Sequence, residues 1–236
     1  MMNLEQRKTR SAGLCIIVSM LAGIFSVAPA VDSAKFLTEA AANSNQVIGA
    51  SISQFIISLA YIGFAILLYP ILKKFGNSLV IGFLSFRIMA ATLMILGILL
   101  LLAVLVLSQE SLRHLSENTS ALEVLGNLLK TTRDYVNHVF MVLTLCLGNF
   151  MFYILLIRSK LIPPWLSVWG IIGAFLSIVA SILVLFQAVE IITAEYLVLN
   201  APTALQELIL GFWLMIKGFD DKVMSYPTGL LESERF

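Results

Sequence analysis

Residues 79–107 read LVIGFLSFRIMAATLMILGILLLLAVLVL, and Arg87 is the only charged residue among them. An α-helix rises about 1.5 Å per residue, so about twenty apolar residues cross the ~30 Å hydrocarbon core of a bilayer. The stretch is longer than this requirement. It predicts a transmembrane helix that tilts or projects beyond the bilayer.

The composition extends this interpretation to the whole chain of 236 residues. Apolar residues make up 59% of it and charged residues 12%, with a mean hydropathy of +0.96. The charged share is about half that of an ordinary soluble domain. The net charge is only +1 and no basic tract occurs, so nothing favours a nucleic-acid partner. The predicted fold class is all-α, a polytopic transmembrane helix bundle whose main partner is the lipid bilayer.

Similar apolar segments recur along the chain and are separated by charged residues and by Gly and Pro turns. We expect one transmembrane domain over residues 1–219, with six helices at residues 11–31, 47–72, 79–107, 137–157, 165–192 and 203–219. Between the third and fourth helices, leucines recur at helical spacing in residues 108–136. They predict a short amphipathic helical segment that lies on the outer, non-cytoplasmic face of the membrane. Residues 220–236 are expected to form a cytoplasmic tail.

The N-terminal segment allows two interpretations. The sequence RKTR at residues 7–10 precedes an apolar run that ends in APA at residues 28–30, an arrangement typical of a cleaved signal peptide. The run is longer than the apolar core of most signal peptides. We therefore expect a retained first transmembrane helix.

Basic residues in short loops predict the orientation, because they collect on the cytoplasmic side of a membrane protein. With six helices, one side carries Arg7, Lys8, Arg10, Lys73, Lys74, Arg158, Lys160, Lys217, Lys222 and Arg235, and the other carries only Lys35, Arg113, Lys130 and Arg133. Both termini are therefore expected in the cytoplasm. Trp165 and Trp169 then lie near the inner interface, and Tyr135 and Tyr196 near the outer one, as an aromatic belt requires.

Polar side chains at membrane depth are costly, which makes each one a candidate for a functional site. Counting helix rise from the cytoplasmic ends places Arg87 about 12 Å deep and Glu207 about 15 Å deep. The same count places Ser19, Tyr61 and Asn149 at about 14 Å. We predict a buried polar layer of these five residues. An Arg87–Glu207 pair that locks two helices together is the favoured interpretation, and a substrate or ion pathway is the alternative.

A second polar group is predicted on the outer side, formed by Asp134, His138, Glu190, Gln187 and Gln54. Asp134 and His138 are one helical turn apart, so they form a solvated neighbouring pair, a proton relay or part of a metal site. The solvated pair is favoured. The chain has only 2 His, and its 2 Cys have no paired spacing, so we predict neither a metal nor a cofactor.

Several short motifs carry a family resemblance. They are RSAGL at residues 10–14, FRIMA at 86–90, IPPWL at 162–166 and WLMIKG at 213–218. From about Arg7 to Gly218 the chain resembles the bacterial membrane proteins of the domain-of-unknown-function family DUF4386. The resemblance implies a multi-pass protein of the bacterial inner membrane and brings no established activity.

Two classes of function remain. The favoured class is a non-enzymatic membrane component, either a small transporter-like protein or an accessory subunit that contacts a membrane-protein partner or a second copy of itself. The alternative is an intramembrane enzyme that uses Glu207, or Asp134 with His138. The motifs of nucleophile-elbow hydrolases, phosphate-binding loops and zincins do not occur in the sequence.

Overall fold

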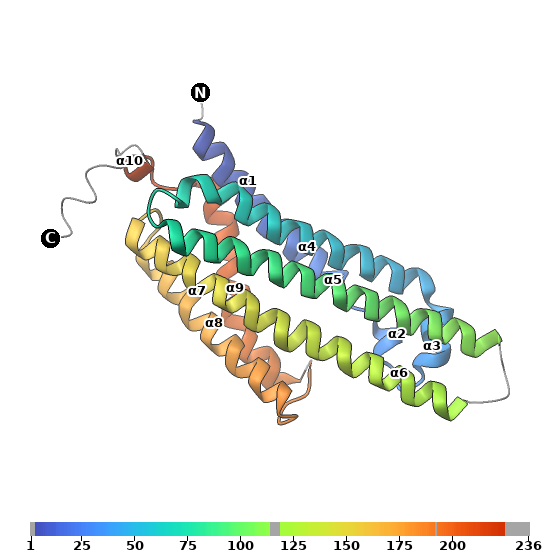
Figure 1. Ribbon diagram of the computed structural model, residues 1–236. Helices are drawn as coiled ribbons and strands as arrows, with labels where there is room; N and C mark the ends of the chain where they lie inside the picture. The colour runs from blue at the N-terminus through green and yellow to red at the C-terminus, as the bar shows by residue number, and fades with distance from the viewer. Residues whose placement is uncertain (1–2, 114–118, 192, 225–236) are drawn as a thin grey trace.

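The computed structural model describes residues 3–113, 119–191 and 193–224 and contains only helices among them, so the all-α prediction is confirmed (Figure 1). The elements are α1 (Leu4–Ile24), α2 (Pro29–Asp32), α3 (Phe36–Ala42), α4 (Ser44–Leu72), α5 (Asn77–Arg113), α6 (Thr119–Asp134), the π-helix η1 (Tyr135–Phe140), α7 (Met141–Ser159), α8 (Pro164–Leu185), α9 (Ala194–Ile216) and α10 (Asp221–Met224).

The long helices pack into a closed ring. In order around the ring, α1 contacts α4, α4 contacts α5, α5 contacts α7, α7 contacts α8, α8 contacts α9, and α9 returns to α1. Aromatic rings fill its interior: the centroid of Phe152 lies 4.9 Å from Phe83 and 5.4 Å from Phe64. Burial of these large rings contributes to an apolar core that also contains many leucines and isoleucines.

Five helices of the described chain are long and apolar enough to cross a membrane: Ser44–Leu72, Asn77–Arg113, Ser120–Ser159, Pro164–Leu185 and Ala194–Ile216. The helix α1 is not among them, because its first two turns contain Glu5, Arg7, Lys8 and Arg10. Helix length and composition therefore give five candidate spans, one fewer than the sequence predicts.

The helix α1 ends at Ile24, well before the predicted end at Val31. Proline is unfavourable beyond the first turn of a helix, because its ring clashes with the carbonyl one turn earlier and it lacks a backbone donor. Pro29 therefore starts the short helix α2, and the chain turns before it, where the backbone N–H of Phe25 donates to the carbonyl of Ala22 at 3.1 Å.

The helix α9 begins at Ala194, so the prediction of a loop up to residue 201 is wrong. Thr193 caps the helix, because its hydroxyl accepts a hydrogen bond from the backbone N–H of Tyr196. The predicted helix begins only after Pro202, but this proline lies inside α9, where it removes only one backbone donor.

The helix α8 ends at Leu185, earlier than predicted. Gln187 adopts a left-handed conformation with φ 57°, and the backbone N–H of Ala188 donates to the carbonyl of Leu183 at 2.9 Å. This closing turn satisfies carbonyls that would otherwise lack a partner at the end of the helix.

The amphipathic segment expected on the membrane face is helical and corresponds to α6. It runs through η1 into α7 as one continuous rod and packs along α5. Apolar residues of α2, α3, α4 and α5 form a separate core at this end, against which Leu122 and Leu129 of α6 pack. Part of the apolar surface of α6 therefore packs against this core, and another part, with Leu125 and Leu128, is exposed.

The two termini of the described chain meet at the opposite end of the ring. The amide nitrogen of Gln6 donates to the carbonyl of Phe219 at 2.7 Å, and the backbone N–H of Asp220 donates to the carbonyl of Leu161 at 3.1 Å. Figure 1 shows the N-terminus and α10 at this end, and α2, α3 and the start of α6 at the other.

Candidate functional site

Arg87 lies in the interior of the ring with only 5% of its surface exposed. The FRIMA segment places it on the inner face of α5, where three aromatic rings surround its guanidinium. The guanidinium carbon lies 5.0 Å from the ring centroid of Phe64, 5.2 Å from Tyr61 and 5.5 Å from Phe83. Contacts with the negative faces of aromatic rings offset part of the cost of burying this charge.

Asn149 of α7 connects Arg87 to Glu207. The Nη2 of Arg87 donates to the Oδ1 of Asn149 at 2.6 Å, and the Asn149 side chain also hydrogen-bonds the Glu207 carboxylate of α9. Arg87 and Glu207 interact electrostatically, but no direct ion pair joins them in the described structure. The two charges therefore belong to one cluster in which a buried amide is the link.

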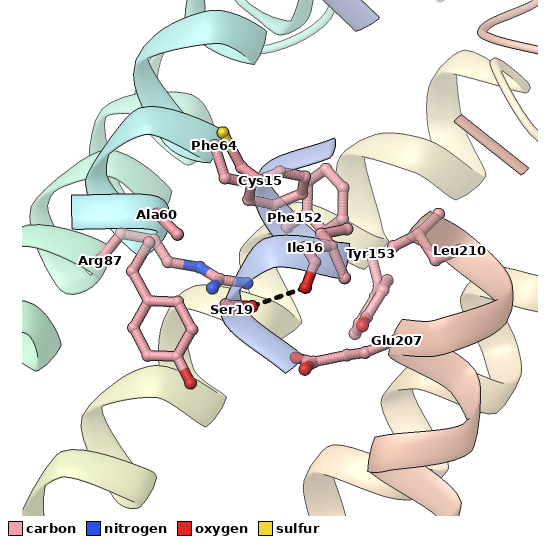
Figure 2. Close-up of a pocket in the computed structure, with 11 residues that line it drawn as sticks. Cys15, Ile16, Ser19, Ala60, Phe64, Arg87, Phe152, Tyr153, Glu207 and Leu210 are labelled. Carbon is pink, nitrogen blue, oxygen red and sulfur yellow. Dashed lines mark hydrogen bonds between the residues drawn. The ribbon is translucent and has the colours of Figure 1, made fainter. Parts of the chain in front are cut away.

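The space between these groups is small. A cavity of about 10 Å³ is lined by Ser19, Tyr61, Arg87 and Glu207 among others, which is room for about one water molecule. Figure 2 shows Arg87 and Glu207 pointing towards it from opposite sides, with Ser19 of α1 between them. The Nε of Arg87 is buried there without a hydrogen-bond partner.

The predicted layer thus comes together in the structure, with different roles for its members. Ser19 keeps its hydroxyl bond within α1, to the carbonyl of Ile16 at 2.7 Å, and Tyr61 presents its ring. We call Ser19, Tyr61, Arg87, Asn149 and Glu207 the buried polar cluster. Its cavity has room for one water molecule but not for an organic substrate.

Sequence reasoning missed a neighbouring polar contact. The hydroxyl of Tyr153 donates to the Oε1 of Gln206 at 2.7 Å, and the Nε2 of Gln206 donates to the carbonyl of Leu166 at 3.2 Å. Gln206 is fully buried. The sequence did show that Gln206 stands beside Glu207 in the apolar second half of α9, and this position indicated a buried polar side chain.

A far larger pocket lies at the other end of the ring. It has a volume of about 590 Å³ and lies between α6, η1 and the connection from α8 to α9. Four of the five residues predicted for the outer group line it: Asp134, His138, Gln187 and Glu190. The fifth, Gln54, lies elsewhere and donates to the carbonyl of Ser26 at 3.0 Å, which holds the end of α1 against α4.

An ion-pair network that the sequence did not suggest forms one wall of this pocket, which we call the outer pocket after the predicted outer group that lines it. The Nη2 of Arg133 lies 2.5 Å from a carboxylate oxygen of Asp32 and 2.7 Å from one of Asp134. Arg133 is 8% exposed. Asp32 comes from α2, about a hundred positions away in the sequence, so spacing could not reveal the contact.

His138 is held at the edge of this pocket by contacts on two sides. Its Nδ1 lies 3.0 Å from the hydroxyl of Tyr196, and its backbone carbonyl accepts a hydrogen bond from Ser181 at 2.9 Å. The π-helix η1, which contains His138, leaves such carbonyls available for side-chain donors. Among the described residues, no group of three or more His, Cys, Asp or Glu side chains is placed to hold a metal ion.

Residues 11–218 match the family described as a domain of unknown function (DUF4386). The chain belongs to this family. The match confirms the predicted resemblance and covers the buried polar cluster, the outer pocket and the whole helix ring of this DUF4386 protein. No curated protein and no solved structure gives a significant match to the chain.

Proposed function

We propose that this DUF4386 protein is a non-enzymatic component of the bacterial inner membrane, with six spans and both termini in the cytoplasm. Its partners are the lipid bilayer and a membrane protein or a second copy of the chain. The buried polar cluster locks its helices together. The observation that carries this last assignment is the cavity of about 10 Å³ at the cluster, which leaves no room for a substrate.

Two features support α1 as the sixth span. The helix α1 completes the ring between α4 and α9. If α1 lay outside the membrane, this side of the buried polar cluster would be uncovered. The inner face of α1 is mostly small or polar, whereas Leu14, Leu21 and Ile24 on the other face are 49%, 54% and 68% exposed. Large exposed apolar side chains along one face are expected where lipid is the solvent.

The orientation proposed from the basic residues agrees with the arrangement of the chain ends. The salt bridge between Lys74 and Glu5 at 2.6 Å joins the α4–α5 turn to the start of α1, at the end where the contact between Gln6 and Phe219 also lies. This is the end that carries most of the loop lysines and arginines, which favours a cytoplasmic location for it.

The locking role is tested by a double-mutant cycle on Arg87 and Glu207. Removing one charge strands the other in a low-dielectric layer, so we expect Arg87→Met and Glu207→Gln each to cost on the order of 3–5 kcal/mol. The double variant should cost less than the sum, because neither charge then remains. The measurement is the thermal unfolding midpoint of the purified protein in detergent.

The same substitutions at an exposed ion pair provide the control. Lys74 and Glu5 lie 2.6 Å apart with side chains 36% and 26% exposed, so Lys74→Met and Glu5→Gln should change stability by about 1 kcal/mol at most. Strictly additive losses at Arg87 and Glu207 would contradict the linked cluster. Stability unchanged by either substitution would favour the alternative, a solvated Glu207 that takes part in proton or ion transfer.

A further inference from the structure

The outer pocket arises from a difference in helix length. The continuous rod Ser120–Ser159 has 40 residues, about 60 Å at 1.5 Å per residue, whereas α8 has 22 residues, about 33 Å. The shorter α8 and α9 therefore end beside the middle of the rod. Their connection and the side of the rod enclose a space of about 590 Å³, within the range of small-ligand pockets.

The two cations that line this pocket are already engaged by the protein. Arg133 uses its Nε and Nη2 on Asp32 and Asp134. The Nζ of Lys130 donates to the carbonyl of Ser33 at 3.1 Å and lies 4.6 Å from the ring centroid of Phe36. Arg133 is therefore paired with two carboxylates, whereas Lys130 keeps its charge but holds it against Ser33 and Phe36.

The carboxylates that line the pocket are more available. The side chains of Asp32 and Asp134 are 34% and 29% exposed, and each uses only its Oδ1 in the bonds to Arg133. Glu190, on the opposite wall, is exposed and forms no ion pair within the described chain. With three carboxylates against two cations, the pocket carries a net charge of −1 when His138 is neutral.

We propose that the outer pocket binds the ammonium group of a small organic amine, with Glu190 and Asp134 as the main carboxylate contacts. The remaining walls suit an organic ligand and not a bare cation, because Val184, Val189 and Ile191 line them together with polar side chains. The same ammonium chemistry is offered by a soluble amine and by the headgroup of an aminophospholipid. The inference does not depend on the role proposed for the buried polar cluster.

The test is a titration of the full-length protein in nanodiscs, followed by calorimetry or intrinsic fluorescence. Ethanolamine is the soluble probe, and N-acetylethanolamine is the matched probe without charge. We expect ethanolamine to bind saturably, and its binding to weaken as the salt concentration rises, because salt screens charge interactions. N-acetylethanolamine should not bind. Nanodiscs of phosphatidylethanolamine and of phosphatidylglycerol distinguish the lipid source, because a phosphatidylethanolamine headgroup in the pocket would compete with ethanolamine and weaken its binding only in the former.

Two variants with the same chemical change complete the test. Glu190→Gln should raise the dissociation constant about tenfold, which corresponds to the loss of one charge-assisted contact. Glu195→Gln alters an exposed carboxylate at the start of α9 outside the pocket and should leave binding unchanged. Absence of saturable ethanolamine binding in both kinds of nanodisc would overturn the proposal. Equal binding by the two variants would also overturn it. The unfolding midpoint of each variant shows that a loss of binding is not a loss of fold.

Discussion

Asn149 is the residue on which the buried polar cluster depends. It is 1% exposed, and its amide is one of the few groups that can accept from an arginine and donate to a carboxylate at the same time. A direct Arg87–Glu207 contact would need the helices α5 and α9 to approach each other. Because α7 supplies the amide between them, three helices of the ring are joined by one cluster.

Asn149→Leu tests this residue directly. Leucine is similar in volume but leaves the Nη2 of Arg87 without an acceptor, so we expect a loss of about 3 kcal/mol and an unfolding midpoint lower by about 6–12 °C. Asn200→Leu is the matched control, because within the described residues the amide of Asn200 donates to the carbonyl of Tyr196 in its own helix and to no other helix. Equal shifts for the two variants would mean that Asn149 does not link the charges.

At the scale of elements, the crossing of α1 and α9 determines how closely Ser19 and Glu207 approach the cavity. Two glycines lie at this crossing. A Cβ added to Gly13 would lie 2.7 Å from the backbone oxygen of Gly211 and 2.8 Å from the backbone nitrogen of Met215. Both are backbone atoms, so they cannot move without separating the helices. The close contact is typical of small residues between membrane helices.

Gly13→Ala should therefore destabilise the protein by about 1–3 kcal/mol, because α1 and α9 must move apart to admit the methyl group. Gly23→Ala lies on the same helix with no atom within 4 Å of the added Cβ, and it should be neutral or slightly stabilising. The unfolding midpoint of each purified variant is the measurement. A Gly13 variant as stable as the Gly23 variant would rule out the tight crossing.

At the scale of the whole molecule, α1 decides the topology, because it is the one ring helix that helix length and composition do not identify as a span. If it crosses the bilayer, residues before and after it lie on opposite sides. If it does not, they lie on the same side. Leu4 and Lys35 are both exposed, so they report the two positions.

Accessibility labelling with a membrane-impermeant maleimide in intact cells checks this topology. Cys15 and Cys146 are both free and must first be replaced. We expect Lys35→Cys and Glu195→Cys to react from outside, and Leu4→Cys and Lys160→Cys to react only after permeabilisation. Reaction of both Leu4→Cys and Lys35→Cys from outside would exclude α1 as the sixth span and leave an odd number of crossings.

The sequence by itself determined the all-α class and the approximate positions of the long apolar helices, and it indicated that the buried polar residues share one layer of the bundle. These features are local, since they depend on apolar run length and on a fixed rise per residue. Counting helix rise predicted one layer, and four members of it line one cavity in the structure: Ser19, Tyr61, Arg87 and Glu207. It could not show that Asn149 stands between the charges, because depth contains no information on the rotation of a helix about its axis.

Only the tertiary structure decided the order of helices around the ring, the continuation of α6 into α7 and the pocket at the outer end. Each depends on which segments distant in the sequence lie side by side. The contact of Asp32 with Arg133 joins α2 to α6, and the pocket exists because the rod extends beyond α8 and α9. Packing against neighbours also overrode local signals, since α9 continues through Pro202 where the sequence suggested a helix boundary.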